Sequence, residues 1–284
     1  MVKVFRGWLG VVALAAMLTA FATPVRAESI AMVTDLSGKA AIQGKSATIL
    51  SEIQADARVQ LDAGARLVAI YLKSGDEYSF AGPAQIQFRA SEPQVLSGAK
   101  PQKRGSPLKG SDIRINPIST TQVGFVMRGG RNTARIRLLA LSGTKTLETN
   151  PEFRWQEAEP SLKYQFDLTD ETGKSLIETR VEGASFRLPA SVQLRTGAAY
   201  TWEVSARLRD GRRYVSAGDF SIAPADLRAS AETLRPAIGA PVSDRVAYAA
   251  WLEQMELRDE ARKYWRVLAA ERPDDSKLKS LAGE

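Results

Sequence analysis

Apolar and polar positions alternate along several short stretches between residues 134 and 223. Tyr200 and Trp202 begin one such stretch, which continues to Leu208 and an Asp-Gly turn. The stretch 164–168 alternates in the same way before another turn. An apolar side chain at every second position indicates a strand with one buried face. Strands separated by turns at this spacing predict an antiparallel sandwich for this part of the chain.

A second group of strand patterns covers residues 28–90. The run 66–73 is apolar and rich in strand-forming residues, and a Ser-Gly-Asp turn follows it at 74–76. Two shorter alternating segments lie on either side of Gly82-Pro83. These features predict a small β roll or sandwich.

Helical spacing replaces the strand patterns over residues 224–284. A short helix is expected before Pro236, and Ser243 is the predicted N-cap of a second helix that ends near Leu257. A third helix is expected over 259–271. The predicted fold class is therefore mainly β, with a C-terminal α-helical segment.

The first 27 residues have the layout of a secretory signal peptide. Lys3 and Arg6 precede an apolar run, and Val25-Arg26-Ala27 places small residues where a signal peptidase cleaves. We expect cleavage after Ala27 and a periplasmic location in a Gram-negative envelope. An uncleaved anchor is the alternative, because the run is near the shortest length that crosses a bilayer. No later stretch is apolar enough to do so, and no stable membrane span is expected after cleavage.

The sequence contains no histidine and no cysteine in 284 residues. Imidazole metal ligands, thiolate nucleophiles, disulfides and a lipid-bearing cysteine are thereby excluded. We expect no cofactor and no metal site. The chain must also fold without disulfides in a compartment where they could form.

Basic residues are concentrated in a Gly- and Pro-rich segment, residues 91–133, which is predicted to be a connector. Loss of the signal peptide removes Lys3, Arg6 and Arg26, so the formal net charge falls from +7 to +4. The candidate contacts for an anionic partner in the connector are Lys100, Lys103, Arg104, Lys109, Arg114, Arg128 and Arg131.

The partner expected for this segment is an anionic envelope polymer or a lipid head group. Nucleic acid is not expected, since few aromatic residues are interleaved with the basic ones. A solvated connector that binds nothing is the alternative.

The N-terminal β segment resembles the FecR-type periplasmic domain. The resemblance rests on Val-x-x-x-x-Gly at 33–38, on Val-Gln-Leu-Asp-Ala-Gly-Ala at 59–65, and on a strand, a Ser-Gly-Asp turn, a strand and Gly-Pro-Ala that follow. It covers about a quarter of the chain. Members of that family relay signals from an outer-membrane receptor, so the resemblance implies a sensory or regulatory element. This chain departs from them in lacking a cytoplasmic N-terminal region.

Residues 134–223 resemble a fibronectin type III-like domain, an immunoglobulin-like sandwich. The resemblance rests on Pro-Glu-Phe-Arg-Trp at 151–155, Tyr-x-Phe-x-Leu at 164–168, Leu-Pro at 188–189 and Gly-x-x-Tyr-x-Trp-x-Val at 197–204. Such domains are mostly spacers or binding modules. The resemblance therefore implies display of a binding surface rather than catalysis.

The helical segment partly resembles a single tetratricopeptide repeat. Ala249, Ala261, Trp265 and Pro273 fall at the repeat's spacings. One copy cannot form a solenoid, which needs about three repeats to bury a continuous core. We expect the helical pair to cap the sandwich or to bind a partner.

Candidate catalytic groups are few. Ser-x-x-Lys occurs at 97–100, 106–109 and 142–145. These segments are predicted to be loops or strands, whereas a Ser-Lys dyad is normally placed at the start of a helix. The four tryptophans beyond the signal peptide fall in buried patterns, so exposed aromatic platforms for glycans are not expected.

We therefore expect a non-catalytic interaction or scaffold protein of the cell envelope, with an envelope protein as its partner. A FecR-like sensory element that acts with an envelope receptor is the first alternative. A histidine-independent hydrolase is the second.

Overall fold

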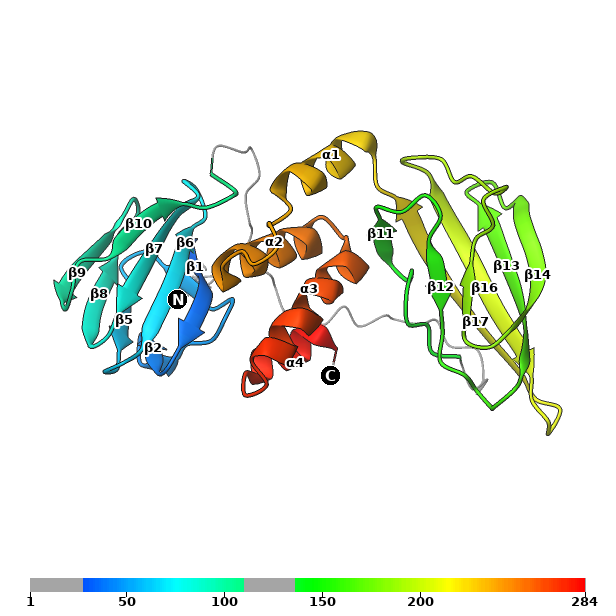
Figure 1. The fold of residues 1–284 in the computed structure, drawn as a ribbon, viewed down its shortest axis with the longest axis horizontal. Coiled ribbons are helices and arrows are strands. Elements are labelled where there is room, and N and C mark those ends of the chain that lie inside the picture. The colour runs from blue at the N-terminus through cyan, green and yellow to red at the C-terminus, as the bar shows by residue number, and fades with distance from the viewer. Residues whose placement is uncertain (1–27, 110–135, 284) are drawn as a thin grey trace, which may run out of the picture.

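The computed structural model describes residues 28–109 and 136–283. They form an N-terminal β unit, a β sandwich and a block of helices (Figure 1). The helical block comes last in the sequence but lies between the two β units in space. The predicted fold class, mainly β with a C-terminal helical segment, is confirmed. The predicted signal peptide, residues 1–27, lies outside the described residues.

The N-terminal unit consists of two five-stranded antiparallel sheets with the strand orders β10-β7-β6-β1-β4 and β3-β2-β5-β8-β9. The strands are β1 (Ser29–Ser37), β2 (Ala40–Ile42), β3 (Lys45–Ser46), β4 (Glu52–Gln54), β5 (Arg58–Leu61), β6 (Arg66–Tyr71), β7 (Asp76–Ala81), β8 (Ala84–Phe88), β9 (Pro93–Ser97) and β10 (Gln102–Gly105).

Strand β6 has an unbroken apolar sequence because both of its faces are buried. Leu67, Ala69 and Tyr71 belong to the core of the N-terminal unit. Ile70 points to the opposite face and belongs to a different core, together with Met32 of β1 and residues of the helices. A continuous apolar run is the pattern expected of a strand covered on both sides.

Two glycines of the FecR-like motifs occupy positions where another side chain would not fit. A Cβ on Gly82 would lie 2.0 Å from the carbonyl oxygen of Asp62. A Cβ on Gly38, which has a φ of 77°, would lie 2.9 Å from the Cα of Ala65. These glycines permit the close backbone approaches that link the motifs in space.

The predicted boundary at residue 90 is wrong, because the N-terminal unit continues beyond it. Strand β9 pairs with β8, and β10 pairs with β7. Both are edge strands, where proline and glycine are tolerated because one side of the ladder needs no partner. This explains why the segment has the composition of a connector. Residues 110–133 of the predicted connector lie outside the described residues.

The sandwich consists of a five-stranded sheet of order β11-β17-β16-β13-β14 and a two-stranded sheet, β12-β15. Strand β11 runs parallel to β17, and the other pairings are antiparallel. The strands are β11 (Thr144–Thr146), β12 (Glu152–Arg154), β13 (Lys163–Asp170), β14 (Ser175–Glu182), β15 (Ser185–Arg187), β16 (Ala199–Arg207) and β17 (Arg213–Ile222).

Aromatic side chains from both sheets form the core of the sandwich. Phe153 contacts Phe166 and Trp202 edge-on, with ring centroids 4.9 and 5.2 Å apart. The hydroxyl of Tyr200, at the start of β16, accepts a hydrogen bond from the backbone N–H of Arg195 at 2.7 Å. A tyrosine that bonds to the backbone a few residues upstream in this way is also found at the tyrosine corner of immunoglobulin-like sandwiches. Membership of the fibronectin type III family remains a prediction.

The helical block contains α1 (Ala225–Leu234), α2 (Val242–Gln254), α3 (Arg258–Glu271) and α4 (Ser276–Ala282). Sequence patterns predicted the first three helices but not α4, whose N-cap Asp275 accepts from the backbone N–H groups of Lys277 and Leu278. The predicted N-cap at Ser243 is wrong, since this residue lies inside α2 and Pro241 occupies the cap.

The four tryptophans beyond the signal peptide are all buried, as predicted from their patterns. Trp155 and Trp202 lie in the sandwich, and Trp251 and Trp265 in the helical block, each at most 1% exposed. Ala249 and Ala261 are also buried between helices. The similarity to a tetratricopeptide repeat remains a prediction.

Candidate functional site

The helical block shares a hydrophobic core with the N-terminal unit. Met32, Ile49 and Ile70 of the β unit are at most 2% exposed and belong to the same buried cluster as Trp251 and Trp265 of the helices. We call this contact the first interface. Because its core is apolar and almost fully buried, the two parts are expected to behave as one body.

An arginine on β10 connects the sheet to the start of α2 at the first interface. Arg104 Nε lies 2.5 Å from Glu77 Oε1 on β7, and Arg104 Nη2 lies 2.5 Å from Asp244 Oδ1 on α2. The same guanidinium donates to Ser243 Oγ at 2.9 Å. A planar fork of donors suits such a three-way contact better than an ammonium would.

The two carboxylates on β7 have different environments. Burial raises the pKa of Glu77, although the hydrogen bond from Arg104 opposes the shift. Hydrogen bonds from Lys109 and Lys103 lower the pKa of its neighbour Asp76. Glu77 Oε2 is buried and has no hydrogen-bond partner among the described residues.

A second arginine joins the end of α3 to β1. Arg272 Nη1 lies 2.6 Å from Asp35 Oδ1 and donates to the Leu36 carbonyl at 3.1 Å. These contacts are on the same sheet as the Arg104 contacts. The first interface is therefore held by buried apolar side chains together with charged groups.

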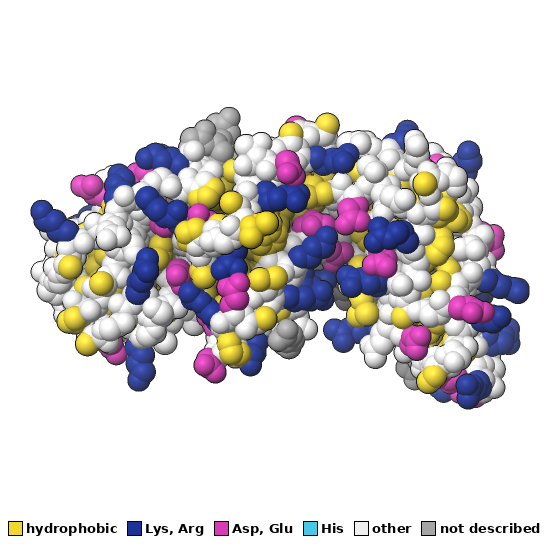
Figure 2. All heavy atoms as spheres, viewed as in Figure 1, with side chains coloured by type: hydrophobic (Ala, Val, Ile, Leu, Met, Phe, Trp, Pro, Cys, Tyr) yellow, Lys and Arg dark blue, Asp and Glu magenta, His cyan; other side chains and the backbone are white. Residues whose placement is uncertain are grey.

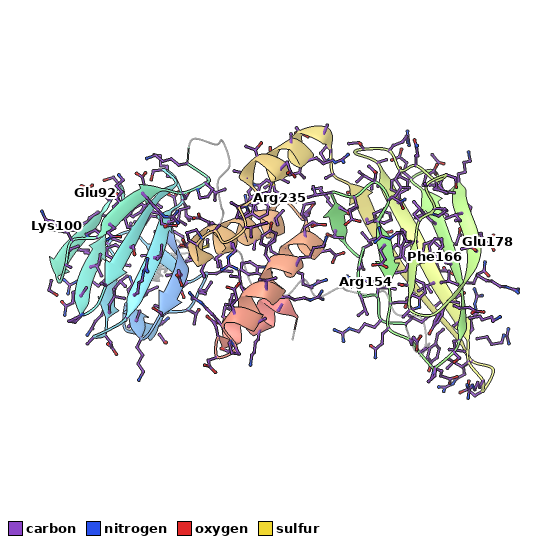
Figure 3. The ribbon with its side chains drawn as sticks, in the orientation of Figure 1. Glu92, Lys100, Arg154, Phe166, Glu178 and Arg235 are labelled. Atoms are coloured by element: carbon purple, nitrogen blue, oxygen red, sulfur yellow. The ribbon has the colours of Figure 1, made fainter. Side chains whose placement is uncertain are left out.

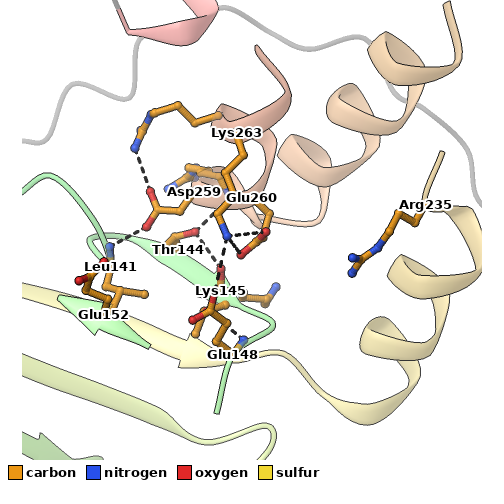
Figure 4. A network of polar contacts seen from close by, with 12 residues as sticks. Leu141, Thr144, Lys145, Glu148, Glu152, Arg235, Asp259, Glu260 and Lys263 are labelled. Carbon is orange, nitrogen blue, oxygen red and sulfur yellow. Dashed lines mark hydrogen bonds and ion pairs between the residues drawn. The ribbon is translucent and has the colours of Figure 1, made fainter. Parts of the chain in front are cut away.

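The second interface joins the turn between α2 and α3 to β11 of the sandwich (Figure 4). The backbone N–H of Lys145 donates to the Glu256 carbonyl at 2.7 Å, and Thr144 Oγ1 donates to the same carbonyl at 2.9 Å. The backbone N–H of Arg258 donates to Thr144 Oγ1 at 3.0 Å. These bonds satisfy backbone groups of a tight helix-helix turn.

Charged side chains extend the second interface. Asp259 Oδ2 accepts from the backbone N–H of Leu141 at 2.7 Å, and Lys145 Nζ lies 2.6 Å from Glu256 Oε2. The guanidinium of Arg258 also donates to the Gly143 carbonyl. Basic and acidic side chains accordingly lie side by side over the helices between the two β units (Figure 2).

Three of the predicted anion contacts are used inside the molecule. Lys103 and Lys109 form ion pairs with Asp76 at 2.9 and 2.6 Å, and Arg104 contacts Glu77 and Asp244. Lys103 and Arg104 lie close to the acidic residues of β7 because β10 pairs with β7. These residues therefore belong to the N-terminal unit rather than to a connector, and their contact with an anionic partner remains a prediction.

Of the other predicted contacts, only Lys100 is among the described residues. Lys100 is exposed and lies at the end of the N-terminal unit away from the helices (Figure 3). Arg114, Arg128 and Arg131 lie outside the described residues. Among the described members of the predicted set, Lys100 therefore lies apart from Lys103, Arg104 and Lys109.

The Ser-x-x-Lys pairs also have internal contacts. Ser106 Oγ accepts from the backbone N–H of Leu108 at 3.2 Å, while Lys109 is paired with Asp76. Lys145 is paired with Glu256. In both cases the ammonium contacts a carboxylate rather than the serine of its own Ser-x-x-Lys match.

A basic groove that sequence reasoning missed lies on the outward face of the five-stranded sheet of the sandwich. It has a volume of about 430 Å³. We define the basic groove by its polar lining residues, Lys163, Gln165, Arg180, Ser205, Arg207 and Arg213.

A local signal for this groove was present in the sequence. Four of the seven residues from 207 to 213 are arginines, and they surround the Asp-Gly turn of the β16–β17 hairpin. Figure 1 places this hairpin at the end of the sandwich away from the helices. Lys163 and Arg180 join the arginines only through strand pairing, which a sequence pattern does not show.

Neither a metal-binding cluster nor a membrane-spanning helix is found among the described residues. In residues 28–109 and 136–283, no group of three or more acidic side chains could hold a metal ion. Among the helices of this part of the chain, none combines the length and apolar character needed to cross a membrane.

Comparison with known proteins leaves the family open. No family model matches the chain, and no curated protein matches it. A crystal structure of CopC from Methylosinus trichosporium OB3b aligns with 17% sequence identity over 32% of this chain and 96% of that chain, with a TM-score of 0.26. A similarity this low supports no inference about function. The class defined by the structure is a mainly β chain in which helices join two β units.

Proposed function

We propose that this chain is an exported, non-catalytic scaffold of the cell envelope that presents two β modules in a fixed arrangement. The observation that carries the proposal is the position of the helical block, which contacts both β units through separate interfaces. A catalytic protein needs one site with converging reactive groups. A scaffold needs a frame that holds its modules in place, and the two interfaces of the helical block support such a role.

The outer faces of both β units support this proposal. The helices cover one sheet of the N-terminal unit, whereas the sheet that contains β9 has the exposed Leu96, 46% accessible. The helical block exposes Val267 on α3, 52% accessible. Exposed apolar side chains on a rigid frame are candidate contacts for a protein partner.

Site-specific photocrosslinking in intact cells tests the scaffold proposal. A photoreactive amino acid replaces Leu96 in one variant and Val267 in another, and crosslinked proteins are identified after irradiation. The same chain without the photoreactive residue, and samples kept dark, are the controls. Discrete protein adducts from at least one position are expected. An intact, correctly exported chain that gives no adduct from either position would contradict the proposal.

The FecR-like sensory alternative has one specific observation in its favour, the exposed Leu96 on the sheet that contains β9. The sensory alternative predicts that the photoreactive residue at position 96 crosslinks to an envelope receptor and that the one at position 267 does not. Deletion of residues 28–90 is not a clean test, because Met32 and Ile70 belong to the core of the helical block. A surface change such as Leu96→Ser is cleaner, since it removes a candidate contact without opening that core.

A further inference from the structure

Four neighbouring strands of the sandwich each contribute one cation to the basic groove. The sheet order β17-β16-β13-β14 places Arg213, Arg207, Lys163 and Arg180 on successive strands. Their side chains are exposed on the outward face, while the intervening residues Tyr164 and Ala206 are buried in the core. Figure 3 shows the same division on this sheet, with Glu178 outside and Phe166 inside.

Internal contacts neutralise these cations only in part. Lys163 is in register with Glu182 on β14, and Arg180 lies one row further along, opposite Gln165. Arg207 and Arg213 are directly opposite in the β16–β17 ladder, an arrangement of like charges that disfavours the fold. No acidic residue lines the groove. Arg213 Nη2 lies 3.9 Å from Glu203, and Lys163 Nζ lies 2.9 Å from Glu182, both in exposed pairs that stabilise little.

The spacing of the cations requires a ligand with more than one anionic group. Adjacent strands lie about 4.8 Å apart, so four strands place the outer cations roughly 14 Å from each other. A single phosphate or carboxylate cannot contact both ends of such a row. Between the cations lies the half-buried Gln165, whose Nε2 donates to Glu178 at 3.1 Å and whose amide oxygen can accept a hydrogen bond from the same ligand.

An acidic row borders the groove along the strands. Asp167 pairs in register with Glu178 on one side and with Glu203 on the other. These three residues lie two positions along the strands from the row of Gln165. Their negative charge repels an anionic chain from the rest of the sheet and confines it to the basic end.

The groove lacks the features of a protein-binding surface. Interface hot spots are aromatic or aliphatic anchors that fill pockets. The apolar residues that line the groove, Tyr164 and Ala206, are 0% and 4% exposed and offer no such anchor. Charge and hydrogen bonding therefore favour a hydrophilic anionic chain over a folded protein.

We propose that the basic groove binds a linear anionic polymer that carries phosphate or carboxylate groups along its chain. This inference rests on the proposed scaffold function and assigns one of its contact sites. Arginine guanidinium groups bind both kinds of oxyanion through paired hydrogen bonds. The shared requirement is a row of negative charges that matches cations on successive strands.

Binding of labelled polymers to the chain that follows residue 27 tests the proposal. Short-chain polyphosphate supplies the phosphate source, oligogalacturonate the carboxylate source, and dextran the neutral control. Binding to at least one anionic polymer, weakened by added salt, is expected, with no binding to dextran. Failure to bind either anionic polymer at low salt would overturn the proposal.

A matched pair of triple variants locates the binding site. Arg180→Gln, Arg207→Gln and Arg213→Gln together remove three charges from the groove. Lys45→Gln, Lys73→Gln and Lys100→Gln remove three exposed charges from the N-terminal unit. The groove variant is expected to bind about tenfold or more weakly and with a smaller salt dependence, while the control variant binds within about twofold of the original chain. Equal losses in the two variants would overturn the assignment.

Two further measurements distinguish polymer binding from misfolding of the variant and from self-association of the chain. Thermal unfolding of both variants shows whether the groove variant is folded, and a folded variant with unchanged affinity would overturn the proposal. Sedimentation velocity shows whether the face joins two copies of the chain; self-association that the groove variant abolishes, without polymer binding, would also overturn it. Crosslinking from Leu96 or Val267 is independent of these results, so the scaffold proposal can survive their failure.

Discussion

Arg104 and Asp244 are 140 residues apart in the sequence, yet Arg104 Nη2 lies 2.5 Å from Asp244 Oδ1. The contact connects an edge strand of the N-terminal unit to the first turn of α2. Glu77 lies on the other side of the same guanidinium, and its side chain is only 4% exposed. The arginine thus compensates two carboxylates that solvent reaches poorly.

Arg104→Gln is expected to destabilise the protein by about 1–3 kcal/mol at pH 7. The substitution leaves Glu77 buried without a positive partner, which is costly, but the 42% exposure of Arg104 lets solvent screen part of the effect. Urea unfolding monitored by tryptophan fluorescence measures the change, since Trp251 and Trp265 lie in the attached helices.

Arg89→Gln is the matched control for this substitution. Arg89 pairs with Asp56 at 2.6 Å, but both side chains are at least half exposed. Exposed pairs contribute at most about 1 kcal/mol. A loss for Arg89→Gln as large as that for Arg104→Gln would show that burial of Glu77 is not the cause.

Glu253→Gln is expected to stabilise the protein at neutral pH and to have little effect in acid. Burial raises the pKa of Glu253, although the hydrogen bond from Trp265 Nε1 and the charges of Arg262 and Arg258 oppose the shift. A raised carboxyl pKa means that the fold favours the protonated form. The contribution of Glu253 is therefore greatest below the ordinary carboxyl pKa of about 4.3 and is lost as pH rises through the raised value.

Urea midpoints measured from about pH 4 to pH 7 check this sign. The difference between Glu253→Gln and the original chain should grow as pH rises. Glu256→Gln is the opposite case, because the hydrogen bond from Lys145 lowers the pKa of Glu256. Its removal should cost stability at neutral pH, and the cost should vanish in acid. Parallel pH curves for all three proteins would contradict both pKa assignments.

Gly82→Ala is expected to disrupt the N-terminal unit. The added Cβ would lie 2.0 Å from the Asp62 carbonyl oxygen, so the backbone of one strand connection must move. Gly44→Ala is the control, because Gly44 has a φ of 78° but open space around the new methyl group. The control should lose only about 1–2 kcal/mol from its left-handed backbone. Equal unfolding midpoints for the two variants would show that the contact at Gly82 is unimportant.

Trp202→Ala is expected to destabilise the sandwich by about 3–5 kcal/mol. Trp202 is fully buried, and its Nε1 donates to the Leu141 carbonyl at 2.7 Å. Trp202→Phe keeps most of the ring volume but leaves that carbonyl without its donor, so a smaller loss of about 1–3 kcal/mol is expected. The free energies of chemical unfolding of the two variants separate the contribution of ring packing from that of the hydrogen bond. Equal stability of both variants and the original chain would contradict a core role.

Local patterns predicted several strands, among them β6, β13 and β16, and three of the helices, because these depend on the spacing of side chains along one segment. Tyr200 and Trp202 alternate with polar residues since one face of β16 is buried. The apolar run of β6 predicted a strand, but not that helices cover its second face.

The candidate site was harder to predict, because it depends on pairing between distant segments. Lys103 and Lys109 looked unpaired in the sequence, but strand pairing brings them to Asp76. The groove cations were missed for the same reason, since Arg180 reaches Arg207 and Arg213 only through the order of strands in the sheet. Charge counts along a chain do not show which charges meet in the fold.

The position of the helical block also has a consequence for the order in which the chain can fold. Synthesis produces β1 and β6 long before α2, so Met32 and Ile70 remain uncovered until the last quarter of the chain is made. A product that stops before residue 225 would expose this apolar face, a feature that favours aggregation and recognition by chaperones. Synthesis of the helical block therefore protects an apolar face that the preceding β strands cannot cover by themselves.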